Sequence, residues 1–123
     1  MFKPTEFGLL LKEKRRAINL NQNDLAEAIG KTGQYISNIE KGKNNAPPKQ
    51  EDIELLIHKL SLDETEAQRF RCAAAADRNQ LPKAQMEYIL SHKSLLDLLE
   101  YGTSHKVSDN QWKTLLNSIS GGK

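Results

Sequence analysis

The chain has 123 residues, with 18 Lys and Arg against 16 Asp and Glu, one Cys and 6% aromatic residues, and its net charge is +2. This length corresponds to one compact domain with at most a small appendage, the single Cys excludes an internal disulfide, and the small charge does not by itself indicate a nucleic-acid partner. The longest apolar run, residues 72–76, is far shorter than the ~20 residues of a membrane span, and the N-terminus lacks a signal-peptide pattern. We therefore expect a cytoplasmic protein rich in helices.

Apolar residues recur at helical spacing in four segments of the first half. Thr5 is the expected N-cap of the first segment, and Pro47-Pro48 precede the fourth. The apolar faces of the four segments are Phe7, Leu10, Leu11 and Ile18; Leu25, Ala26 and Ile29; Ile36 and Ile39; and Ile53, Leu56, Ile57 and Leu60.

The second half continues the helical pattern. Asp63 with Glu66, and Ser108 with Gln111, have the spacing of capping boxes that open helices. Cys72 lies between these boxes and is expected to be a small buried apolar residue. No window alternates with a period of two, so we predict an all-α fold. The apolar faces here are Ala67, Phe70 and Ala74; Met86, Ile89, Leu90, Leu95, Leu96, Leu98 and Leu99; and Trp112, Leu115, Leu116 and Ile119.

Charge is distributed unevenly along the chain. The window from Lys12 to Lys49 has eight basic and four acidic residues, a balance of 8 − 4 = +4, whereas Leu62 to Lys123 has eight of each and is neutral. The basic bias therefore belongs to the first half. Its first cluster, Lys12, Lys14, Arg15 and Arg16, is interpreted as a solvated helix face.

The segment from Leu20 to Gly42 carries the clearest functional signal. Asn21 can cap a short helix, Gly30 can end it in a left-handed conformation, and Thr32 can cap the next helix after a tight turn. Two short helices joined in this way, with amide side chains on the exposed face of the second, form a helix-turn-helix whose second helix enters the major groove of DNA.

The segment resembles the helix-turn-helix of lambda-repressor-like (Cro or xenobiotic-response-element type) transcriptional regulators. The residues that carry the resemblance are Leu20, Gln22, Leu25, Ala26, Gly30, Thr32, Ile36, Ser37, Ile39, Glu40 and Gly42. The resemblance implies a bundle of about five helices with a C-terminal helical extension, and a DNA-binding domain over residues 1–62 with its motif at about 21–40. It also implies a regulator of bacterial, phage or plasmid origin.

The resemblance assigns roles to individual residues. Gln34, Ser37 and Asn38 are expected to read bases, since amide side chains pair well with adenine. Glu40 is expected to make a structural hydrogen bond or ion pair, because its carboxylate would be repelled by DNA. Gly33 departs from the family pattern, in which many relatives have a base-reading side chain at this position. The phosphate-contacting set comprises Gln22, Lys31, Gly33, Tyr35, Lys41, Lys43 and Asn44.

Residues 63–123 have a less specific pattern, that of a helical extension for dimerisation or partner binding. The leading hypothesis is a homodimeric repressor that binds double-stranded DNA at an inverted repeat and associates through residues 81–119. The alternative is an antitoxin-like protein that binds a partner through residues 63–119 and represses its own operon. His58, His92 and His105 lack metal-ligand spacing, and no nucleophile–base pattern or phosphate loop is present, so we expect no enzyme activity, metal or cofactor.

Overall fold

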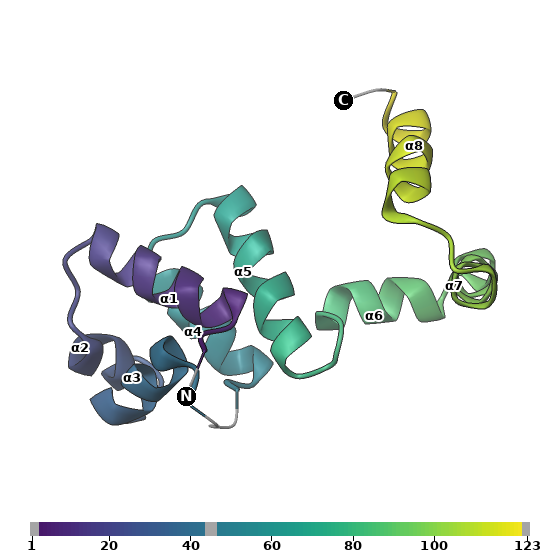
Figure 1. Ribbon diagram of the computed structural model, residues 1–123. Helices are drawn as coiled ribbons and strands as arrows, with labels where there is room; N and C mark the ends of the chain where they lie inside the picture. The colour runs from purple at the N-terminus through teal and green to yellow at the C-terminus, as the bar shows by residue number, and fades with distance from the viewer. Residues whose placement is uncertain (1–2, 44–46, 122–123) are drawn as a thin grey trace. The chain divides into compact units, whose positions relative to one another are not determined.

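The computed structural model describes residues 3–43 and 47–121 and, within them, contains helices and no strands. The predicted all-α fold is therefore confirmed. Contacts divide the chain into two compact units, Met1–Lys83 and Ala84–Lys123. The helices, labelled in Figure 1, are α1 (Glu6–Ala17), α2 (Gln22–Glu27), α3 (Gly33–Lys41), α4 (Gln50–Lys59), α5 (Glu64–Asp77), α6 (Lys83–Leu90), α7 (Lys93–His105) and α8 (Asp109–Ser120).

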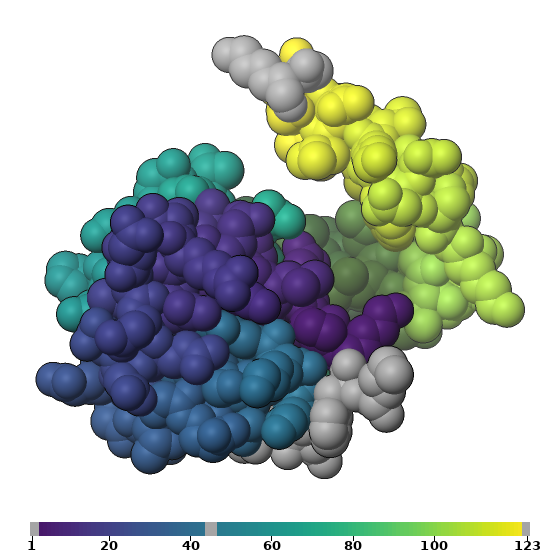
Figure 2. All heavy atoms as spheres, turned by 60° about the vertical axis from the view of Figure 1, so that its left-hand side comes forward, coloured from purple at the N-terminus to yellow at the C-terminus, as the bar shows by residue number. Residues whose placement is uncertain are grey.

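Helices α1 to α5 share one hydrophobic core. Within this core the rings of Phe7 and Phe70 pack together with a centroid distance of 4.9 Å, which joins α1 directly to α5. In the space-filling view the purple to teal atoms of this unit form one closely packed body (Figure 2). Its buried apolar residues are Phe7, Leu10, Leu11, Leu25, Ala26, Ile29, Ile36, Ile39, Ile53, Leu56, Ile57, Leu60, Ala67, Phe70, Ala73 and Ala74.

Helix α5 belongs to the N-terminal unit, which extends to Lys83. The physical reason is that α5 buries Ala67, Phe70 and Ala74 against the shared core. The extension that remains outside the core therefore consists of α6 to α8.

The local signals in the sequence predicted the helix starts well. Thr5, Asn21 and Thr32 each accept a hydrogen bond from a backbone N–H in the first turn of their helix. Both capping boxes, Asp63 with Glu66 and Ser108 with Gln111, are also confirmed. The agreement follows from the local nature of caps, which need only residues three positions apart.

Two expectations about burial were wrong. Ile18 is exposed because α1 ends at Ala17 and the chain turns before the next apolar position of the stripe. Cys72 is also exposed, because it lies on the outer side of α5, where its sulfur is near the Gln68 amide.

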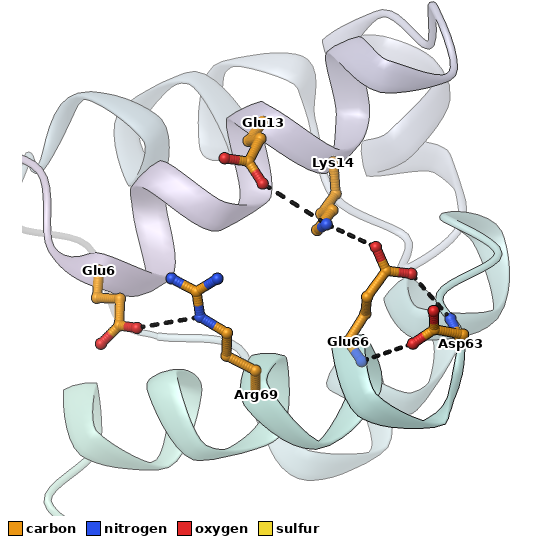
Figure 3. A network of polar contacts seen from close by, with 6 residues as sticks. All are labelled: Glu6, Glu13, Lys14, Asp63, Glu66 and Arg69. Carbon is orange, nitrogen blue, oxygen red and sulfur yellow. Dashed lines mark hydrogen bonds and ion pairs between the residues drawn. The ribbon is translucent and has the colours of Figure 1, made fainter.

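Ion pairs between polar side chains link α5 to α1 along one edge of the core (Figure 3). The Lys14 ammonium lies 2.6 Å from a Glu66 carboxylate oxygen, and Arg69 forms a second, exposed ion pair with Glu6 at 3.5 Å. The other Glu66 oxygen accepts the backbone N–H of Asp63. Lys14, predicted to be a solvated residue, thus forms an ion pair between helices.

The C-terminal unit differs from the N-terminal unit in the burial of its side chains. None of the residues in α6, α7 or α8 is buried, and Leu116 and Ile119 are 61% and 77% exposed. One close contact joins α7 to α8, since a Cβ added at Gly102 would lie 2.6 Å from the Trp112 ring. Within the described residues, no helix is long and apolar enough to cross a membrane.

The contact between Lys14 and Glu66 predicts a pH-dependent contribution to stability. The Lys14 ammonium first, and then the Asp63 N–H, lower the pKa of Glu66. Ionised Glu66 therefore stabilises the fold above its unfolded pKa of ~4.3, and this contribution is lost as the pH falls through the lower folded value. In urea unfolding, Glu66→Gln should be less stable than wild type at pH 7, and the difference should narrow below about pH 4.

Glu64→Gln is the matched control, because Glu64 is exposed in the same first turn of α5. Equal unfolding free energies for the two variants at pH 7 would show that the contact between Lys14 and Glu66 does not hold α5.

Candidate nucleic-acid interface

Helices α2 and α3 form the predicted helix-turn-helix (Figure 1). Gly30 turns the chain between them with a φ of +65°, a conformation that glycine adopts without steric cost. Helix α3 then packs Ile36 and Ile39 into the core and ends at Gly42, whose φ is +78°. The second helix of the motif is thus fixed at both ends and along its inner face.

Helix α1 supports the C-terminal end of α3 through an unusually close approach. A Cβ added to Gly8 would lie 2.5 Å from the Ile39 carbonyl oxygen, which is closer than real Cβ contacts. Gly8 is therefore required by packing between helices. The signal in the sequence was a glycine inside an otherwise helical pattern, which indicates close packing.

A buried ion pair connects the same two helices. Arg15 of α1 donates from Nε to Glu40 Oε2 at 2.7 Å, and from an Nη to Oε1 at 2.9 Å. Arg15 is 9% exposed and Glu40 is 4% exposed. The other Nη of Arg15 donates to the Leu20 carbonyl, and Gln22 Nε2 donates to Glu40 Oε1 at 3.0 Å. The hydrogen bonds to Glu40 raise the pKa of Arg15 despite its burial.

This network confirms one expectation and corrects another. Glu40 makes the structural ion pair that was predicted for it, whereas Arg15 is not part of a solvated face. Its position was readable in the sequence, since Phe7, Leu11 and Arg15 are spaced by four residues and share the inner face of α1. Gln22, predicted to contact phosphate, uses one N–H on Glu40 and keeps a second for another partner.

The exposed face of α3 presents two amides that contact each other. Gln34 Nε2 donates to Asn38 Oδ1 at 2.8 Å, one helical turn away. Ser37, the third predicted base reader, lies on the inner side of the helix and is only 8% exposed. The helix turns Ser37 toward the core, away from the exposed contact between Gln34 and Asn38.

The residues predicted to contact phosphate surround this face. Lys31, Lys41 and Lys43 are exposed, and Gly33 is the first residue of α3. Among the described residues, the backbone N–H groups of Gly33 and Gln34 have no partner, as is normal in a first helical turn. Asn44 lies outside the described residues.

Tyr35 combines packing with partial exposure. Its ring packs against the core and lies 5.4 Å from the Lys31 ammonium, in the range of a cation–π contact. Burial, and secondarily the Asp52 carboxylate, raise the pKa of Tyr35. The phenol is therefore neutral at physiological pH.

The buried ion pair yields a prediction with an internal control. Glu54 and Arg71 have the same two-point geometry as Glu40 and Arg15, with distances of 2.7 and 2.9 Å, but the Glu54 side chain is 55% exposed. Glu40→Gln should lower the unfolding free energy by ~3–5 kcal/mol, because it leaves a buried guanidinium without a counter-charge. Glu54→Gln should cost at most ~1 kcal/mol.

Urea unfolding of the two variants at pH 7 measures the comparison. Equal losses of unfolding free energy in the two variants would contradict the view that burial makes the ion pair of Arg15 and Glu40 more important for stability than the exposed pair of Arg71 and Glu54.

Comparison with known proteins agrees with this geometry. A helix-turn-helix family model (HTH_3) matches residues 11–66, which include α2, α3 and α4. No curated protein and no solved structure matches the chain. Residues 11–66 match the lambda-repressor/Cro-like helix-turn-helix family, and this match supports a DNA-binding transcription regulator.

Proposed function

We propose that the protein is a dimeric repressor that binds an inverted-repeat operator and blocks transcription there. Each subunit inserts α3 into the major groove, with the paired amides of Gln34 and Asn38 facing the bases. The observation that carries this proposal is the exposed contact between those amides on a helix fixed by the buried pair of Arg15 and Glu40.

The amide pair has the chemistry needed to read adenine. Gln34 keeps its Oε1 acceptor and one N–H, while Asn38 keeps both of its N–H donors. Adenine presents an N7 acceptor and an N6 donor in the major groove, which one amide can bind at two points. The contact between the two side chains also limits their freedom before DNA binds, so less conformational entropy is lost on binding.

The surrounding groups provide contacts to the DNA backbone. Lysine ammonium groups release counterions from phosphates, and free N–H groups in the first turn of a helix bind phosphate oxygens. These contacts position α3 without reading sequence. The proposed phosphate-binding groups are the side chains of Lys31, Tyr35, Lys41 and Lys43, the second N–H of Gln22, and the backbone N–H of Gly33.

The C-terminal unit supports the dimeric part of the proposal. Helices α6 to α8, all of them within the described residues, bury no side chain and so form no core of their own, and their apolar side chains need a partner surface. The segment from residue 84 to 123 has four Lys and four Asp or Glu, so its charges cancel and two copies do not repel each other. We assign a second copy of the chain as the partner.

The same exposed surface also fits a different protein, as in an antitoxin that binds a toxin and represses its own operon. This second candidate shares the DNA-binding half and differs only in what covers α6 to α8. A dimeric mass of the purified protein favours the repressor, whereas a monomer that acquires stable mass only with a different protein favours the antitoxin.

Selection of duplexes from a random pool, combined with measurement of the mass of the bound protein, tests the proposal directly. We expect a selected motif with two-fold symmetry and two subunits per duplex. Selection of no common motif would contradict sequence-specific repression.

The amide assignment gives a base-specific prediction. Gln34→Ala should lose ~1–3 kcal/mol of discrimination at particular base pairs of the selected operator, because a two-point amide contact is removed there. Binding to duplexes with single base-pair changes measures this loss. Gln68→Ala, an exposed glutamine on α5, is the control, and unchanged base preferences in Gln34→Ala would contradict the assignment.

A phosphate contact should behave differently. Lys43→Ala should weaken binding to all duplexes alike and reduce the slope of log affinity against log salt by about one, since one fewer counterion is released. Titration at several salt concentrations measures the slope. Lys59→Ala on α4 is the matched control, and equal slopes for the two variants would contradict a role for Lys43.

The dimer surface is tested on α8. Leu116→Glu should shift the protein toward a monomeric mass, because a charge would be buried in an apolar interface, while binding to a single half-site is retained. Asn117→Glu places the same charge at the next position of the helix and should remain dimeric. A dimer unaffected by Leu116→Glu would locate the interface elsewhere.

A further inference from the structure

Gly33 stands at the first position of the recognition helix, and the space beside it is occupied by another residue. A Cβ added to Gly33 would overlap Oδ1 of Asn23 and lie 3.0 Å from Asn23 Cγ. Asn23 belongs to α2, so its carboxamide fills from a neighbouring helix the volume that a side chain at position 33 would use.

The Asn23 carboxamide does not help to hold the described part of the fold together. The two residues before it both make hydrogen bonds: Asn21 accepts from the Asp24 N–H and caps α2, and Gln22 donates to Glu40. Asn23 is exposed, and among the described residues its side chain has no hydrogen-bond partner. A polar group of this kind, held beside the start of α3, is open to an external ligand.

We propose that Asn23 is a base-reading residue that replaces the side chain absent from position 33. The inference rests on the proposed function, because it requires α3 to enter the major groove with its N-terminal residues at the base edges. The carboxamide provides a donor and an acceptor, the pattern that matches N7 and N6 of adenine. Asn23 thus extends the readout by Gln34 and Asn38 to a base pair next to theirs.

Two substitutions should disturb this contact in the same way. Asn23→Ala removes the carboxamide, and Gly33→Ala displaces it, because the new methyl group occupies its place. Gly33 is helical without a positive φ, so alanine is tolerated by the backbone there. Both single variants should therefore fold, which thermal unfolding verifies.

The test measures binding of the full chain to the selected operator and to duplexes in which one base pair at a time is replaced. Each single variant should lose roughly tenfold discrimination at one and the same base pair. The double variant should lose no more than Asn23→Ala alone, since no carboxamide remains for the methyl group at position 33 to displace.

Unchanged base preferences in Asn23→Ala would overturn the inference. A uniform loss of affinity for all duplexes would also overturn it, because that pattern indicates a phosphate contact, and so would additive losses of base discrimination in the double variant. Gln34→Ala separates this failure from failure of the proposed function. If Gln34→Ala alters base preference and Asn23→Ala does not, only the role of Asn23 is wrong, whereas wild-type protein without any base preference would reject both.

Discussion

The buried ion pair between Arg15 and Glu40 is the interaction on which the DNA-binding unit depends. Removing two charges from water is costly, and the cost is offset only when geometry and additional hydrogen bonds are favourable. Here the two-point contact, the Leu20 carbonyl and the Gln22 amide together satisfy both groups. Since the pair joins α1, the start of α2 and the end of α3, it fixes the rotation of α3 and thereby which side chains face outward.

The buried ion pair also affects which charges of the chain lie at the surface. Arg15 and Glu40 neutralise each other inside the protein. The exposed lysines between Lys12 and Lys49 therefore remain as the positive charge near Gln34 and Asn38 on α3. The C-terminal unit is neutral and exposes several large apolar side chains, which supports the proposed association with a second copy. The net charge of +2 therefore lies in the N-terminal unit, and the C-terminal unit contributes none.

Local features of the fold could be predicted from the sequence, because caps, turns and apolar stripes involve residues only a few positions apart. Thr5, Asn21, Thr32 and the two capping boxes are examples. Long-range features could not be predicted. Spacing places Arg15 on the inner face of α1, but its pairing with Glu40, 25 residues away, and the packing of Phe70 on Phe7 join residues far apart in the chain. In the same way, only the packing of α2 on α3 shows that Asn23 fills the space beside Gly33.

Hydrogen exchange of the intact protein with and without its selected duplex tests whether α3 and the start of α2 bind DNA, because bound DNA should slow exchange where it covers the backbone. We expect new protection between Thr32 and Lys43 and at the start of α2, while α5 exchanges as in the free protein. Protection confined to α6, α7 and α8, with α3 unchanged, would contradict it.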